Sequence, residues 1–257
     1  MATYVTSDLH GMGAIWDKIK AKITSEDTLY ILGDMIDRGP DGLRILEETI
    51  DMPNIKFCLG NHEEFFMQYA EKLVKGELKY PDKKLWEING GEPTMKNIID
   101  KYTYRVDQLE ELINKMCYKF DYLKIFKAGD RIYYLNHSGC IDKDAISDDY
   151  IWNRTHFIDD WDREENAKII HGHTPVLNAI NEITNLRVAK LEKEGRIEDA
   201  DQMRSQGILA VKEFIAKPKI LKYCDGHKID LDLCCFNTGV AALIKLEDES
   251  VEYIHVW

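Results

Sequence analysis

The sequence of 257 residues has no apolar run approaching the roughly 20 residues that a membrane-spanning helix needs. Its first residues lack the basic region and apolar core of a secretion signal, so we expect a cytoplasmic protein. Positive charge is scarce, because 34 basic residues face 46 acidic ones and leave a net charge of −12. This balance argues against a protein that binds duplex nucleic acid by neutralising phosphates.

Paired cysteine motifs are also missing. Four of the six cysteines stand alone, and Cys234 and Cys235 are adjacent, so no CxxC pair exists. This pattern favours reduced thiols over a disulfide framework. Hydrophobic residues make up 44% of the chain and charged residues 31%, which excludes a disordered or collagen-like protein. The length fits one large α/β domain, and we expect a single domain over residues 1–257.

One local pattern recurs five times in the sequence. A short apolar, β-prone run ends, and Asp, Asn or His follows within a few residues. The runs at 4–6, 29–32, 56–59, 132–135 and 168–170 are followed in turn by Asp8 and His10, Asp34, Asn61 and His62, His137, and His171 and His173. Continuous apolar runs of this length suit buried strands. Because the carboxyl ends of such strands meet at one edge of an open α/β sheet, we expect one site there.

Helical patterns lie between these runs. We expect helices near residues 15–23 and 43–50, and a mostly helical segment over about 63–118 that is broken near 80–81 and 89–91. A second, charge-rich helical segment covers about 178–217, and β patterns return at 229–233, 241–244 and 251–254. The sequence therefore predicts an α/β fold with two helical insertions.

The candidate ligands combine carboxylate, amide and imidazole groups, which together suit Mn²⁺, Fe or Zn²⁺ better than Mg²⁺ or Ca²⁺. Asp8 and His10 are two residues apart, so their side chains fall on the same side and can share an ion. The set is too large for one ion. Two divalent ions ~3.5–4 Å apart, with one bridging carboxylate, would use all of it. Such ions would leave roughly +2 at the site despite the acidic surface, and Arg38 would add a planar charge suited to phosphate.

Five motifs extend this interpretation to a family. In order along the chain they are Ser7–Gly11 (SDLHG), Gly33–Gly39 (GDMIDRG), Gly60–Glu63 (GNHE), Asn136–Gly139 (NHSG) and Gly172–Thr174 (GHT), and they span about two-thirds of the chain. The combination resembles the calcineurin-like metallophosphoesterases, specifically the phosphoprotein phosphatase family in its bacterial Ser/Thr protein phosphatase form. Trp86 with residues 89–91 and Thr94, and Trp152–Arg154, also resemble this branch.

The resemblance implies a four-layer α/β/β/α sandwich and a role for each motif residue. Asp8 and His10 would bind the first metal, Asp34 would bridge, Asn61, His137 and His173 would bind the second, Arg38 and Arg154 would grip the phosphate, and His62 would donate a proton with Asp37 as its partner. Two departures from the family pattern stand out. Ser7 replaces a glycine, and Pro175 stands where many relatives outside this branch carry another His, which leaves the first metal three protein ligands.

Simpler interpretations of the same residues stay open at this point. Asx and Gly residues are common in the turns that follow strands, His62 can be an outer-shell structural group, and Arg154 can form a surface salt bridge. We interpret His171 as structural and leave it out of the metal shell.

The resemblance implies metal-dependent hydrolysis of phosphomonoesters by direct attack of water. Our main hypothesis is a Ser/Thr protein phosphatase that acts on a phosphorylated protein and uses two divalent ions, with Mn²⁺ preferred over Fe or Zn²⁺. One alternative is a hydrolase of dinucleoside polyphosphates, such as diadenosine tetraphosphate, or of another small phosphorylated metabolite. A non-catalytic binding protein is a further alternative. The oligomeric state stays open, and we expect no membrane partner.

Overall fold

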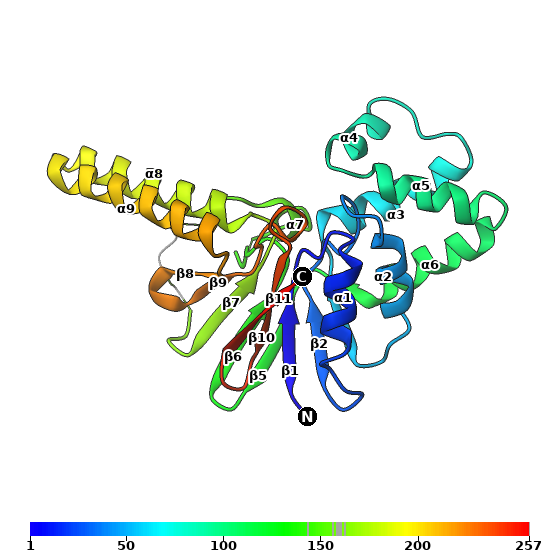
Figure 1. The fold of residues 1–257 in the computed structure, drawn as a ribbon, viewed down its shortest axis with the longest axis horizontal. Coiled ribbons are helices and arrows are strands. Elements are labelled where there is room, and N and C mark those ends of the chain that lie inside the picture. The colour runs from blue at the N-terminus through cyan, green and yellow to red at the C-terminus, as the bar shows by residue number, and fades with distance from the viewer. Residues whose placement is uncertain (143, 156, 158–160, 162, 257) are drawn as a thin grey trace.

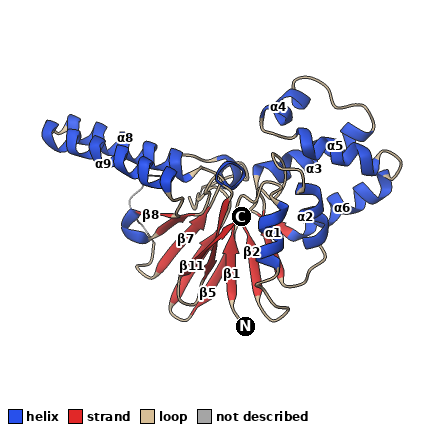
Figure 2. Cartoon of the chain, viewed as in Figure 1, coloured by secondary structure: helices blue, strands red, loops and turns tan. Residues whose placement is uncertain are grey.

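The computed structural model describes residues 1–142, 144–155, 157, 161 and 163–256. Two β-sheets form its centre (Figures 1 and 2). The first has the order β11-β10-β1-β2-β3-β4 and contains β1 (Thr3–Thr6), β2 (Thr28–Ile31), β3 (Ile55–Cys58), β4 (Phe120–Asp121), β10 (Val240–Lys245) and β11 (Ser250–His255). Strands β1 to β4 are parallel, whereas β10 and β11 pair antiparallel.

The second sheet has the order β5-β6-β7-β9-β8. It contains β5 (Lys124–Ala128), β6 (Arg131–Leu135), β7 (Ala167–His171), β8 (Leu221–Tyr223) and β9 (Lys228–Asp230). The three central strands β6, β7 and β9 are parallel, and the edge strands β5 and β8 pair antiparallel. The five apolar runs correspond to the parallel strands β1, β2, β3, β6 and β7. Such runs suit strands that are covered on both faces. The other two parallel strands, β4 and β9, pair with β3 and β7.

Helices lie on the outer side of the first sheet, some against its strands and others against neighbouring helices. They are α1 (Gly13–Lys20), α2 (Gly42–Thr49), α3 (Asn61–Val74), α4 (Asp82–Ile88), α5 (Glu92–Tyr102) and α6 (Val106–Lys119). Their apolar sides bury Trp16, Leu46 and Phe66 against Leu29 and Phe57 of the sheet. The predicted helical segment at 63–118 therefore consists of four helices, with the predicted breaks at 80–81 and 89–91 on either side of α4.

The two sheets pack face to face through a second apolar cluster. Val5 of β1 and Ile244 of β10 meet Tyr133 of β6 and Ile170 of β7 there. On the far side of the second sheet, Ala179 and Ile183 of α8 (Val176–Lys193) pack near Tyr223 of β8. The predicted α/β fold, with two sheets between helical layers, is confirmed.

The second insertion is a hairpin of two long helices. Helix α8 and helix α9 (Ile197–Ala216) pack side by side along their length, and Gly207 lies against Thr184. The hairpin projects beyond the sheets, at the left of Figure 1. The sequence predicted one helical segment over about 178–217, whereas the structure turns at residues 194–196. None of the described helices is both long and apolar enough to cross a membrane.

Three short helices complete the described fold: α7 (Asp149–Trp152), the 3-10 turn η1 (Cys224–Gly226) and α10 (Cys235–Thr238). Two expected elements end early. Helix α1 stops at Lys20 rather than at residue 23, and β9 stops at Asp230 rather than at residue 233. After β9 the side chain of Asp232 accepts a hydrogen bond from the backbone N–H of Cys234 (2.8 Å), which replaces a strand pairing by a turn.

Candidate metal centre

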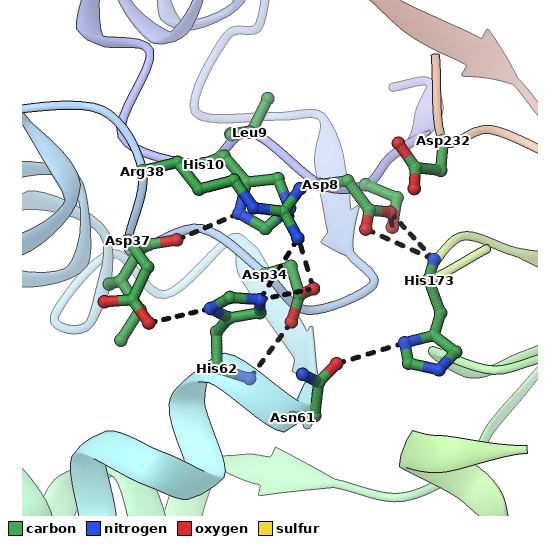
Figure 3. A network of polar contacts seen from close by, with 12 residues as sticks. Asp8, Leu9, His10, Asp34, Asp37, Arg38, Asn61, His62, His173 and Asp232 are labelled. Atoms are coloured by element: carbon green, nitrogen blue, oxygen red, sulfur yellow. Dashed lines mark hydrogen bonds and ion pairs between the residues drawn. The ribbon is translucent and has the colours of Figure 1, made fainter. Parts of the chain in front are cut away.

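Six candidate ligands gather at one edge of the two sheets. Two follow β1, and one each follows β2, β3, β6 and β7, so both sheets contribute. All are buried, at most 4% exposed: Asp8, His10, Asp34, Asn61, His137 and His173. The structure thus brings together every metal ligand that the sequence indicated, and Figure 3 shows five of them from close by.

Asp34 lies at the centre of this group. One cluster of donor atoms joins His10, Asp34 and His62, and a second joins Asp34, His137 and His173, with the atoms of each cluster within 4.8 Å of one another. The Asp34 Oδ1 atom is 3.4 Å from His137 Nε2, and its Oδ2 atom is 3.7 Å from His10 Nε2. Since Asp34 belongs to both clusters, its two oxygens can serve two cations.

Three donor atoms converge in the second cluster. Asn61 Oδ1 lies 3.1 Å from His137 Nε2 and 3.0 Å from His173 Nδ1, and the two ring nitrogens are 3.1 Å apart. Two imidazole nitrogens and an amide oxygen that face one another need a proton or a cation between them. A divalent ion with nitrogen and oxygen ligands fits this donor set.

The outer contacts of the imidazoles point their metal-binding nitrogens inward. His10 Nδ1 contacts the Ile36 carbonyl (3.1 Å), and His137 Nδ1 contacts the Leu32 carbonyl (2.7 Å). Each carbonyl accepts the Nδ1 proton, which leaves the Nε2 lone pair free for a cation. Among the described residues, His10 Nε2 is buried without a hydrogen-bond partner. Because such an orphaned nitrogen is costly, the site fits a bound metal ion.

The backbone that presents these side chains is unusual. Six non-glycine residues of the site have φ between +43° and +68°: Asp8, His10, Asp34, Asp37, Arg38 and His173. The left-handed region is unfavourable for residues that carry a Cβ atom. It reverses the chain sharply after β1, β2 and β7, so that neighbouring side chains reach into the same small space.

His62 lies beside the Oδ2 atom of Asp34, whereas Asn61 belongs to the cluster beside Oδ1. The Nδ1 atom of His62 lies 2.7 Å from Asp37 Oδ2, and because a carboxylate only accepts, the ring nitrogen donates. The Nε2 atom points toward the centre, 3.7 Å from Asp34 Oδ2 and 3.5 Å from Arg38 Nη2. Burial lowers the pKa of His62, but the charge of Asp34 and the hydrogen bond with Asp37 outweigh burial and raise it above its usual value. A protonated ring near neutral pH is suited to donate a proton.

The two arginines approach from opposite motifs. Arg38 is half-buried, and its backbone N–H donates to the Gly90 carbonyl (2.8 Å) between α4 and α5. Arg154 is exposed and donates through Nη1 to Thr174 Oγ1 (3.1 Å), next to His173. After burial and His137, the charge of Arg154 is a further cause that lowers the pKa of His173. Both guanidinium groups therefore lie beside the candidate ligands.

His171 has other partners. Its Nε2 atom lies 2.8 Å from the Tyr223 hydroxyl and its Nδ1 atom 2.9 Å from the Gly172 carbonyl. Burial lowers the pKa of this ring to about 3, so it stays neutral. These contacts give His171 a structural place behind the ligand loop.

Sequence reasoning missed two acidic residues at the site. Asp230 and Asp232 are buried beside Asp8, and Figure 3 shows Asp232 near the Asp8 carboxylate. Burial, and then the charge of Asp232, raises the pKa of both Asp8 and Asp230. Crowded buried carboxylates of this kind favour a cation among them. Both residues lie inside the β pattern expected at 229–233, whereas the strand ends at Asp230, so the alternation of Asp with Ile and Leu hid their place after a strand.

Glu63 was part of a quoted motif but received no role. It is fully buried, and its carboxylate accepts hydrogen bonds from the backbone N–H groups of Asp34 (2.7 Å) and Met35 (2.8 Å). Helix α3 thereby holds the loop that follows β2. This long-range contact fixes the position of Asp34 between the two clusters.

Comparison with known proteins decides the family. The model of the calcineurin-like phosphoesterase family matches residues 1–200. This chain is a calcineurin-like phosphoesterase. It is therefore a hydrolase of the metallophosphoesterase type, a family that uses a dinuclear divalent metal centre, and the structure shows two His/Asp clusters that share Asp34.

The relatives of this calcineurin-like phosphoesterase do not confirm the Ser/Thr phosphatase branch. A curated symmetrical bis(5'-nucleosyl)-tetraphosphatase of Acidovorax sp. (strain JS42) is 36% identical over 67 residues, which are 24% of this chain and 24% of that relative. The match thus spans about a quarter of the relative's length. A solved structure of a candidate diadenosine tetraphosphatase covers 100% of this chain and 94% of its own, with a TM-score of 0.58 and 13% identity.

A Ser/Thr protein phosphatase from Saccharomyces cerevisiae is also similar in fold. It covers 99% of this chain and 80% of its own, with a TM-score of 0.50 and 12% identity. At such low identity both solved structures show the fold alone. The fold therefore does not separate the two substrate classes, and the expected Ser/Thr phosphatase assignment has less support than its alternative.

Proposed function

We propose that this calcineurin-like phosphoesterase hydrolyses dinucleoside polyphosphates symmetrically, so that diadenosine tetraphosphate yields two molecules of ADP. The observation that carries the hydrolytic part is the convergence of donor atoms on both oxygens of Asp34. The substrate class is supported by the activity printed for curated relatives such as the Acidovorax protein. Asp8 and His10 would hold one ion with Asp34, and Asn61, His137 and His173 the other.

The residues of the chain have separate tasks in this reaction. Bound ions supply Lewis-acid activation of water and charge for the phosphoryl oxygens. Arg38 and Arg154 bind and orient the polyphosphate, because a planar guanidinium pairs with two phosphate oxygens. His62 donates the proton on Nε2 to the departing oxygen, while Asp37 holds the ring by Nδ1. With divalent ions bound, the ions and the two arginines would give the site a positive field, although the whole chain carries −12.

The experiment compares substrates on one preparation. The full chain loaded with Mn²⁺ is offered diadenosine tetraphosphate and, in parallel, phosphoserine and phosphothreonine peptides, and products are separated by chromatography. We expect efficient conversion of the dinucleotide to ADP, with little ATP or AMP, and slow release of phosphate from the peptides. Efficient peptide dephosphorylation beside negligible dinucleotide cleavage would assign the chain to the Ser/Thr phosphatases instead.

A third outcome addresses the binding-protein alternative. The leaving group of 4-nitrophenyl phosphate needs no proton. If the metal-loaded chain hydrolyses neither the dinucleotide, nor the peptides, nor 4-nitrophenyl phosphate, then the catalytic proposal is wrong. Retention of the donor set around Asp34 together with His62 and Asp37 argues against that outcome.

A further inference from the structure

Trp86 of α4 is linked to the candidate proton donor, His62, through the carboxylate of Asp37. Its indole N–H donates to Asp37 Oδ2 over 2.9 Å, and the same oxygen accepts the Nδ1 proton of His62 over 2.7 Å. All three side chains are at most 1% exposed. Trp86 lies on the insertion between α3 and α5, so an element outside the ligand loops touches the partner of the proton donor.

Without such a contact the Asp37 carboxylate could offer either oxygen to His62. The indole makes the two oxygens different, because Oδ2 receives two donors while the buried Oδ1 has no hydrogen-bond partner among the described residues. The backbone of Asp37 is held separately, since its N–H donates to Thr94 Oγ1 (3.0 Å) at the start of α5. Backbone and side chain of Asp37 are thus both positioned by the α4–α5 region.

The indole itself is tightly held. A Cβ atom built on Gly91 would lie 2.2 Å from Trp86 Cδ1 and 2.5 Å from Nε1, so the backbone of residue 91 packs directly against the donor edge of the ring. Tyr69 of α3 packs on it as well, with ring centroids 6.2 Å apart. A ring held on two sides has little freedom to turn its N–H away from Asp37.

We propose that Trp86 is a positioning residue for proton donation: its indole N–H fixes the Asp37 carboxylate, and through it the His62 ring, with Nε2 toward the leaving group. This inference rests on the proposed function, because it needs His62 to act as the donor. It assigns a task to the α4 insertion that ligand binding alone does not require. It also predicts that the loss of Trp86 resembles a partial loss of His62, rather than a loss of metal.

The test uses the Mn²⁺-loaded full chain and two substrates of similar size, phenyl phosphate and 4-nitrophenyl phosphate. The phenolate of the first needs a proton, whereas nitrophenolate leaves without one. Trp86→Phe keeps an aromatic ring and removes the N–H. We expect kcat on phenyl phosphate to fall roughly ten- to a hundredfold, as for other outer-shell partners, and kcat on 4-nitrophenyl phosphate to change much less. In a His62→Asn background the same substitution should have no further effect.

The matched control is Trp16→Phe. Trp16 is also fully buried and also donates its indole N–H to a carboxylate, Glu48 Oε2, over 3.0 Å, but it lies on α1 and its carboxylate partner is not Asp37. It should leave the ratio of the two activities unchanged. Gly91→Ala is the second probe, since it keeps Trp86 yet pushes on its ring, and residue 91 has an ordinary φ of −72°. It should reproduce the selective loss even if Trp86→Phe does not fold.

Two results would overturn the inference while the wild-type chain is active. One is an equal loss on both substrates in Trp86→Phe and Gly91→Ala, which would mean a packing role only. The other is the same loss in the His62→Asn background. Failure of the proposed function has a different signature. A Ser/Thr phosphatase would hydrolyse both aryl phosphates and phosphopeptides but not diadenosine tetraphosphate, and a non-catalytic chain would hydrolyse neither aryl phosphate.

Discussion

Replacing Gly33 by alanine tests how closely the ligand loops must approach each other. Gly33 precedes Asp34 and has φ +84°, which a residue with a Cβ atom rarely adopts. A Cβ atom at this position would lie 2.6 Å from Gly60 Cα, 2.7 Å from Gly60 N and 2.8 Å from His137 Nδ1. Two of these three atoms are backbone, so the overlap cannot be relieved by a side-chain rotation.

The magnitude has two parts. The left-handed conformation costs alanine about 1–2 kcal/mol, and overpacking against rigid neighbours adds about 1–3 kcal/mol. Gly76, which follows α3, separates them: it has a similar φ of +69°, but an added Cβ would meet no atom within 4 Å. Gly76→Ala should therefore show the conformational cost alone. Gly33→Ala should be about 1–3 kcal/mol less stable than that control.

The assay combines chemical denaturation with Mn²⁺ titration by calorimetry. In Gly33→Ala the His137 ring must move from the Leu32 carbonyl that fixes it, so we expect Mn²⁺ affinity to fall roughly ten- to a hundredfold. Gly76→Ala should bind Mn²⁺ as the wild type does. Equal unfolding free energies for the two variants, together with unchanged Mn²⁺ affinity in Gly33→Ala, would refute the close approach of the loops described above.

Two further predictions concern charge. Asp34→Asn should lower the amount of bound Mn²⁺, measured by elemental analysis after dialysis. It should also reduce kcat about a thousandfold or more, because one amide oxygen cannot serve two ions. Near-normal turnover would contradict the bridging role. The pKa of Glu48 is lowered to about 2, chiefly by the hydrogen bond from Trp16 and also by Lys20 and Arg44. The charged carboxylate therefore stabilises the fold at neutral pH, and this contribution is lost as pH falls toward 2. Glu48→Gln should lower the free energy of unfolding by ~1 kcal/mol at neutral pH, a value discounted for the partial exposure of Glu48. The difference in stability between variant and wild type should shrink in acid. A difference that grows in acid would contradict a lowered pKa.

The ligand loops could be predicted because each ligand is a local feature of the sequence. Asp34 and His137 follow continuous apolar runs, and such runs become central parallel strands whichever neighbours they find. The edge strand β11 was expected at 251–254, but the edge strands β4 and β5 were missed for the opposite reason. Strand β5 has two lysines among its five residues, Lys124–Ala128, and β4 has two residues, so only pairing with a neighbour defines them.

The supporting contacts of the site could not be predicted from the sequence in the same way. Glu63 reaches back to the backbone of Asp34 across 29 positions, and Trp86 reaches Asp37 across 49. Neither distance follows from periodicity or composition. The turn between α8 and α9 was a different kind of miss: Gly195, with φ +75°, marks it in the sequence, but the surrounding charged residues read as one helix.

The left-handed residues around the metal centre have a consequence for protein engineering. Replacing one of them, such as Asp8 or Arg38, by glycine would remove about 1 kcal/mol of backbone strain, so an inactive variant can be more stable than the wild type. A screen that selects only for thermal stability would then favour variants that have lost catalytic activity. Stabilising substitutions should therefore spare these left-handed residues and be sought in the hairpin formed by α8 and α9.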